Sequence, residues 1–179
     1  LNAFSGILDG NNHTVTIPEG GLPLFGYVRN TRIRNLNIYG TKIAGYGLVN
    51  NFEGVGLSGT AVEIDNVTLK SGSSTLKAGL LGANKTMSAY AGCSSAFEAT
   101  VRNCTIEKDV VIGYSKKETE IGAIAGRMQG TVENCVSYAT VYGTSYVGGI
   151  IGTRDNAMGN CSVIGCKFYG TVEASGELA

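Results

Sequence analysis

The sequence predicts an all-β fold of the parallel β-helix (solenoid) type, with about five coils of short strands that stack on their equivalents in the next coil. Three observations support this prediction. Cys104, Cys135 and Cys166 are separated by equal intervals of 31 residues. Apolar and polar residues alternate around these cysteines, and glycine-bracketed apolar runs recur in register with them. A fixed period of this length is typical of stacked repeats, in which each repeat buries its apolar face against its neighbours.

The first element expected in each repeat is a strand that begins at an asparagine. Residues two apart in this strand are apolar and the residue between them is usually polar, which is the pattern of a half-buried strand. Five segments share the pattern: 35–38, 66–69, 103–106, 134–137 and 165–168. Ser137 is the one polar residue at an inward position. The asparagines are expected to stack and to satisfy backbone groups at one corner of successive coils; they are Asn35, Asn66, Asn103 and Asn134.

Two more strands complete each predicted coil. The second carries one apolar residue per repeat, namely Ile43, Val111, Val141 and Val172. The third is the glycine-bracketed apolar run, found at 22–26, 47–50, 79–82, 122–126 and 148–152. Three short strands with glycine or polar corners form one coil of a parallel β-helix. Segment 4–17 has two strand-like runs around a turn at 9–12 and is expected to form the first coil or its cap.

Three stretches interrupt the period. Residues 84–100 and 114–120 each extend one coil, and residues 50–60 form a smaller glycine-rich excursion. Insertions in a solenoid form loops on its face, and binding residues concentrate in loops. We therefore expect any binding site to involve these loops.

The glycine-bracketed element, seen at 79–82 and in a varied form at 149–152, is joined to the opening segment 4–14. In these features the chain resembles the GLUG-motif repeats of bacterial secreted and cell-surface proteins, over nearly its whole length. The resemblance implies a right-handed parallel β-helix of pectin-lyase-like architecture and an extracellular or cell-surface location. It also implies an adhesin-like module or a non-catalytic part of an IgA-protease-type polypeptide, and no catalytic residues. The motif is altered at 25–26 and 49–50. We expect residues 1–179 to be one domain, a fragment of a longer surface protein.

Composition restricts the classes of partner. Lys and Arg together number 14, as do Asp and Glu, so the formal net charge is zero. Nucleic acid is not expected as a partner, because binding a phosphate backbone requires clustered cations. No apolar run is long enough for a membrane span. Five cysteines without a Cys-x-x-Cys pair favour neither a disulfide framework nor a zinc site. We expect the inward cysteines to form a ladder of free thiols.

Catalytic chemistry finds little support in the sequence. The four aspartates, Asp9, Asp65, Asp109 and Asp155, are scattered and are better explained by turns. Asp65, Arg102 and Glu133 occupy equivalent outward positions and are expected to form a solvated ladder of ion pairs. His13, the only histidine, has no partner with which to form a metal or catalytic site. No enzyme activity, metal or cofactor is therefore predicted, and a calcium site at 9–12 stays an open alternative.

Tyrosines are the feature that favours binding. Five of them are the candidate ligand-binding residues: Tyr114, Tyr138, Tyr142, Tyr146 and Tyr169. Exposed aromatic rings on a rigid sheet can stack on sugar rings or anchor a protein partner. The expected function is a non-catalytic structural or adhesive module that binds a glycan or a host extracellular protein. Two alternatives stay open: a polysaccharide lyase or hydrolase of the β-helix type, and a passive spacer of an IgA-protease-like polypeptide. No oligomeric state is predicted.

Overall fold

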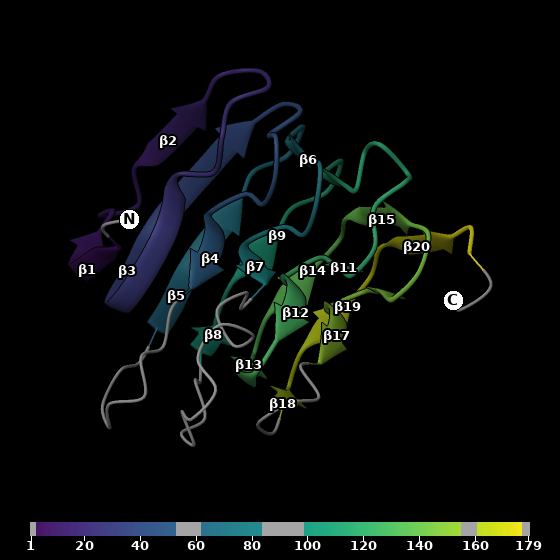
Figure 1. Cartoon of the computed structure of the whole chain (residues 1–179). Helices are drawn as coiled ribbons and strands as arrows, with labels where there is room; N and C mark the ends of the chain where they lie inside the picture. The colour runs from purple at the N-terminus through teal and green to yellow at the C-terminus, as the bar shows by residue number, and fades with distance from the viewer. Residues whose placement is uncertain (1–2, 53–61, 84–98, 155–160, 177–179) are drawn as a thin grey trace.

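A computed structural model describes residues 3–52, 62–83, 99–154 and 161–176. Those residues form strands, turns and bends without a helix, and every pair of strands among them is parallel. The strands belong to three sheets of 14, four and two strands. Figure 1 shows the chain advancing from β1 and β2 at one end to β18 and β20 at the other, so the two termini lie at opposite ends. The predicted all-β fold with parallel pairing is confirmed.

The strands are short apart from β3. The largest sheet contains β1 (Phe4–Asp9), β2 (Thr14–Ile17), β3 (Phe25–Gly40), β4 (Val49–Phe52), β5 (Val62–Leu69), β7 (Leu81–Ala83), β8 (Ala99–Arg102), β9 (Thr105–Ile106), β12 (Ala125–Met128), β13 (Gly130–Glu133), β14 (Val136–Ser137), β17 (Ile151–Arg154), β18 (Cys161–Ile164) and β19 (Lys167–Phe168). The second contains β6 (Ser74–Thr75), β10 (Val111–Ile112), β15 (Thr140–Gly143) and β20 (Thr171–Ala174). The third consists of β11 (Ile121–Gly122) and β16 (Val147–Gly148).

Equivalent residues of successive repeats pair with one another. The series β3, β5, β8, β13 and β18 aligns one inward residue per strand, namely Ile33, Ile64, Val101, Val132 and Val163. The first four are fully buried, whereas Val163 in the last strand is 45% exposed. One hydrophobic core draws on all three sheets. Because burial of such a side chain stabilises the fold by about 1.5–3 kcal/mol, the alternating pattern fixes which face of each strand points inward.

Each expected asparagine strand begins at a corner. The backbone φ is +52° at Asn35, Asn66 and Asn134 and +54° at Asn103, and Gly165 has +62° at the same position. Asparagine and glycine tolerate this left-handed conformation better than other residues. In β3 and β5 the strand runs on through this residue, whereas in later repeats separate strands precede and follow it, such as β8 and β9. Both sides belong to the 14-stranded sheet, so the left-handed residue marks a local corner within that sheet.

The asparagine stack differs in detail from the expectation. The Nδ2 of Asn66 donates to Oδ1 of Asn35 over 2.9 Å, and the Nδ2 of Asn35 donates to Oδ1 of Asp9 over 3.1 Å. The Nδ2 of Asn103 donates to Oδ1 of Asp65 over 2.9 Å. The asparagines had been predicted to satisfy backbone groups. These bonds instead join side chains of neighbouring repeats. The corner residues therefore link one repeat to the next.

The inward cysteines are free thiols, as predicted. Cys104 and Cys135 are fully buried, and Cys166 is half-buried in the last repeat. The Sγ of Cys104 donates to the carbonyl oxygen of Arg102 over 3.2 Å, and burial raises the pKa of this thiol well above its ordinary value. Ser137 is buried too, and its Oγ accepts a hydrogen bond from the backbone N–H of Ala139. Cys93 lies outside the described residues.

The second predicted strand is shifted by one residue in one repeat. Val111 was predicted to be the equivalent of Val141, but Ile112 pairs with Val141 and is fully buried, whereas Val111 pairs with Thr140. Thr75 occupies the equivalent inward position in β6. In a run of consecutive β-branched residues the apolar pattern does not distinguish the two registers, and the strand pairing decides between them.

The glycines of the third element stand where backbones meet closely. The N–H of Gly47 donates to the carbonyl oxygen of Gly79 over 2.8 Å. A Cβ at Gly79 would lie 1.8 Å from the carbonyl oxygen of Ala123, so no larger residue fits without a backbone shift. The opening segment agrees with its prediction as well, since β1 and β2 flank a turn and both pair with β3.

Candidate functional site

One outward column crosses the sheet face that follows the asparagine corner. Its members all stand four residues after a corner Asn or Gly, and we call them the tyrosine column: Tyr39, Lys70, Glu107, Tyr138 and Tyr169. Backbone bonds keep them in register, since the N–H of Lys70 donates to the carbonyl of Ile38 and that of Tyr169 to the carbonyl of Ser137. Thr16 pairs with Tyr39 and extends the column by one strand.

The C-terminal end of the tyrosine column is aromatic. The rings of Tyr138 and Tyr169 are stacked, with centroids 5.3 Å apart and an interplanar angle of 20°. The Nζ of Lys108 lies 5.9 Å from the centroid of the Tyr138 ring. Tyr138 is 37% exposed and Tyr169 is 60% exposed. The pair therefore presents a rigid aromatic surface to solvent.

Lys70 and Glu107 form an ion pair in the middle of the column. The Nζ of Lys70 lies 2.5 Å from Oε1 of Glu107, while the backbone N–H of Ser71 donates to Oε2 over 2.9 Å. Burial raises the pKa of Glu107, but the bonds from Lys70 and Ser71 outweigh it and hold the pKa below its ordinary value. The carboxylate is therefore charged at neutral pH and compensates the lysine.

The N-terminal end of the column borders a shallow depression of about 360 Å³. Its lining contains one aromatic ring, three hydroxyl side chains and the ion pair: Thr14, Thr16, Tyr39, Lys70, Ser71 and Glu107. Tyr39 is 38% exposed, and a Cβ at Gly72 would lie 3.7 Å from its Cε2. The ring thus lies close to the Gly72 corner and forms part of the wall of the depression.

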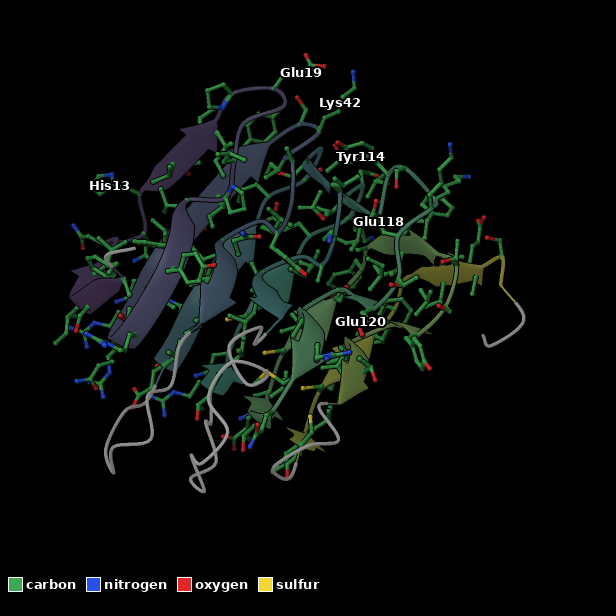
Figure 2. The ribbon with its side chains drawn as sticks, in the orientation of Figure 1. His13, Glu19, Lys42, Tyr114, Glu118 and Glu120 are labelled. Atoms are coloured by element: carbon green, nitrogen blue, oxygen red, sulfur yellow. The ribbon has the colours of Figure 1, made fainter. Side chains whose placement is uncertain are left out.

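The five predicted tyrosines do not form one site. Tyr138 and Tyr169 meet, whereas Tyr142 lies on β15 under the Nζ of Lys116, 4.0 Å from its ring centroid. Tyr146 is 51% exposed near β16. Figure 2 shows Tyr114 and Lys42 on the same side of the molecule. The loop 114–120 packs on segment 143–146 through backbone hydrogen bonds. The other predicted loops lie almost wholly outside the described residues.

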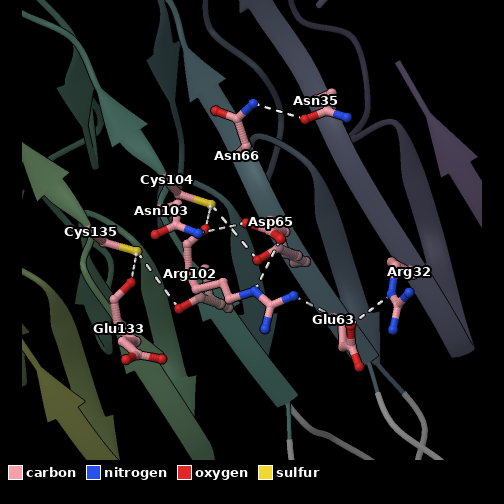
Figure 3. A network of polar contacts seen from close by, with 12 residues as sticks. Arg32, Asn35, Glu63, Asp65, Asn66, Arg102, Asn103, Cys104, Glu133 and Cys135 are labelled. Carbon is pink, nitrogen blue, oxygen red and sulfur yellow. Dashed lines mark hydrogen bonds and ion pairs between the residues drawn. The ribbon is translucent and has the colours of Figure 1, made fainter. Parts of the chain in front are cut away.

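A second outward series precedes the asparagine corner. We call it the charge ladder; its register is Asp9, Arg34, Asp65, Arg102 and Glu133. The Nε of Arg34 lies 2.9 Å from Asp9, and the Nε of Arg102 lies 3.0 Å from Asp65. Figure 3 shows that Glu63, which contacts Arg32 at 2.7 Å, joins the same network. The predicted alignment of Asp65, Arg102 and Glu133 is confirmed.

Asp9 and Asp65 of the charge ladder are poorly suited to proton donation. Burial raises the pKa of Asp65, but the hydrogen bonds from Asn103 and Arg102 outweigh burial and lower it overall. The pKa of Asp9 is also lowered, first by the N–H of Asn11 and then by Asn35 and Arg34. A general acid needs a raised pKa to be protonated near neutral pH. These groups therefore serve as ion-pair partners.

Within the described ranges, no three His, Cys, Asp or Glu side chains gather closely enough to hold a metal ion. No helix long and apolar enough to cross a bilayer occurs in that part of the chain. His13 is exposed, and Figure 2 shows it at one side of the molecule, apart from the labelled Glu118 and Glu120.

Sequence reasoning missed Tyr39, Lys70 and Glu107. Their signal is positional, because each stands four residues after a corner asparagine, as Tyr138 and Tyr169 stand after Asn134 and Gly165. The signal was hidden because residue type changes along the column and because one interval is 37 residues where the others are 31.

Comparisons with known proteins leave the chain without an assigned family. No family model matches it, and searches of curated proteins and of solved structures give no match either.

Proposed function

We propose that the chain is a non-catalytic adhesive module of a secreted or cell-surface bacterial protein, with the GLUG-type repeat as its building unit. Its architecture would be a right-handed parallel β-helix of about five coils. Parallel pairing of each strand with its equivalent one repeat away supports this architecture. So does the single core between the sheets.

The observation that carries the adhesive role is the exposed aromatic end of the tyrosine column. Tyr138 and Tyr169 stack on each other at the surface of a rigid sheet, where their rings have few rotamers to lose on binding. Tyrosines in such positions are frequent anchors of binding surfaces. The ligand would be a glycan or a host extracellular protein.

Binding of the 179-residue chain to an array of glycans and host extracellular proteins tests this function. We expect a saturable hit that Tyr169→Ala weakens about tenfold or more, the size of effect typical of an interface anchor. Tyr146→Ala is the control, because Tyr146 is also more than half exposed but lies off the column. A blank array would overturn the adhesive role in favour of a passive spacer.

The polysaccharide lyase or hydrolase alternative would draw on the charge ladder, where carboxylates and arginines gather (Figure 3). Such enzymes need a carboxyl group whose pKa is raised or a pair of carboxylates free to act on a sugar. Both Asp65 and Glu63 are engaged by arginines, and the pKa of Asp65 is lowered. The adhesive module therefore remains the better-supported proposal.

A further inference from the structure

We propose that the depression bordered by Tyr39 and the Lys70–Glu107 ion pair is a binding site for a linear, neutral oligosaccharide. This inference rests on the proposed adhesive function, and it names both the ligand class and a place that differs from the aromatic end of the column. Four steps support it.

The first step is shape. The depression has a volume of about 360 Å³, at the lower end of the range of about 300–1,000 Å³ found for small-molecule sites. It is open to solvent and bounded by residues from β2 and β3 and from the segments that follow β5 and β9. An open surface of this kind suits one part of a longer chain better than a single enclosed molecule.

The second step is the aromatic wall. The ring of Tyr39 lies close to the Gly72 corner and is partly exposed. An exposed aromatic ring can pack against the apolar C–H face of a sugar, while its hydroxyl stays available for hydrogen bonding.

The third step is charge. Lys70 and Glu107 neutralise each other, and the other lining side chains are uncharged. The surface thus offers charge-assisted hydrogen bonds without attracting an ion of either sign. Thr14, Thr16 and Ser71 add hydroxyl groups that donate and accept. This combination fits the hydroxyl groups of a neutral sugar.

The fourth step is direction. The depression lies at one end of the tyrosine column and includes Tyr39, Lys70 and Glu107. Members of the column stand on neighbouring strands, which are spaced by about 4.8 Å. An extended oligosaccharide lying along the column could place one sugar near Tyr39 and later ones toward Tyr138 and Tyr169. A linear β-1,4-linked chain has the extended shape that such a straight column requires.

Amide NMR titration of the 179-residue chain tests the inference with three probes: neutral cellotetraose, neutral chitotetraose and acidic tetragalacturonate. We expect at least one neutral probe to shift the amides of residues 14–16, 39 and 70–71. Tyr39→Ala should weaken that binding about tenfold or more, since it removes the aromatic anchor. Thr16→Val, which keeps the side-chain shape and removes one hydroxyl, should weaken it by a smaller factor. Tyr146→Ala should leave it unchanged.

The outcomes separate this inference from the proposed function. No shift in the depression with either neutral probe overturns the inference, as does unchanged affinity in Tyr39→Ala or tighter binding of tetragalacturonate. If the array still gives a hit that Tyr169→Ala weakens, the adhesive function survives that failure. A blank array together with a titration that shifts no amide would contradict both the inference and the adhesive function.

Discussion

The two outward series on either side of the asparagine corner are built on the same strands, but their side chains differ in how far they pair with one another. In the charge ladder, Asp9 pairs with Arg34 and Asp65 pairs with Arg102, so charged groups engage one another. In the tyrosine column, a depression and two exposed rings remain open to solvent. A regular scaffold can thus carry one face whose side chains link the repeats and another face that is available to a partner.

The largest effect should come from a change in the core beneath both faces. Cys135→Asp places a carboxylate at a fully buried position, and an unpaired buried charge costs at least about 3 kcal/mol. We expect a large fall in the midpoint of thermal unfolding, measured by circular dichroism. Val136→Asp, on the half-exposed outward side of the same strand, is the control and should cost far less. Equal unfolding of parent and Cys135→Asp would contradict the inward assignment.

An intermediate effect is expected at the corner that separates the two faces. Asn66 has a φ of +52°, and an alanine in this left-handed conformation costs roughly 1–2 kcal/mol. Asn66→Ala should therefore lower the free energy of unfolding in a denaturant titration. Asn66→Gly also loses the bond to Asn35 but tolerates the conformation, so it should be the more stable of the two variants. The opposite order would show that the side-chain stack outweighs backbone conformation.

The smallest effect concerns the charge ladder itself and depends on pH. The folded state lowers the pKa of Asp65 below its ordinary 3.8, so the stabilisation is present above that value and is lost as pH falls through the lower, folded pKa. Asp65→Asn should cost no more than about 1 kcal/mol at neutral pH, since the pair is partly exposed. Its stability should also fall less steeply than that of the parent on acidification below pH 3.8.

Urea titrations of parent and Asp65→Asn across this acidic range measure the difference. Parallel pH profiles for parent and Asp65→Asn would mean that the ion pair with Arg102 contributes nothing to stability.

Much of the strand pattern could be predicted from particular residues. The alternation around Cys104 and Ile106 predicted their burial, and both are fully buried. The segment 134–137 was predicted with Ser137 inward, and it is. The register predicted for the run 110–112 was wrong. Three consecutive β-branched residues do not indicate by their pattern which one points into the core. The tyrosines were predicted as a group, yet only Tyr138 and Tyr169 come together.

The period, most of the inward positions and the corner residues follow from the sequence alone, because apolar alternation and left-handed backbone conformations depend on local residue type. The tertiary structure decided which outward residues meet. Backbone hydrogen bonds between strands restore the register after every loop, so the 37-residue interval between Lys70 and Glu107 places them side by side as the 31-residue interval does for Tyr138 and Tyr169. The depression at Tyr39 exists only because residues from four segments of the chain are aligned in this way.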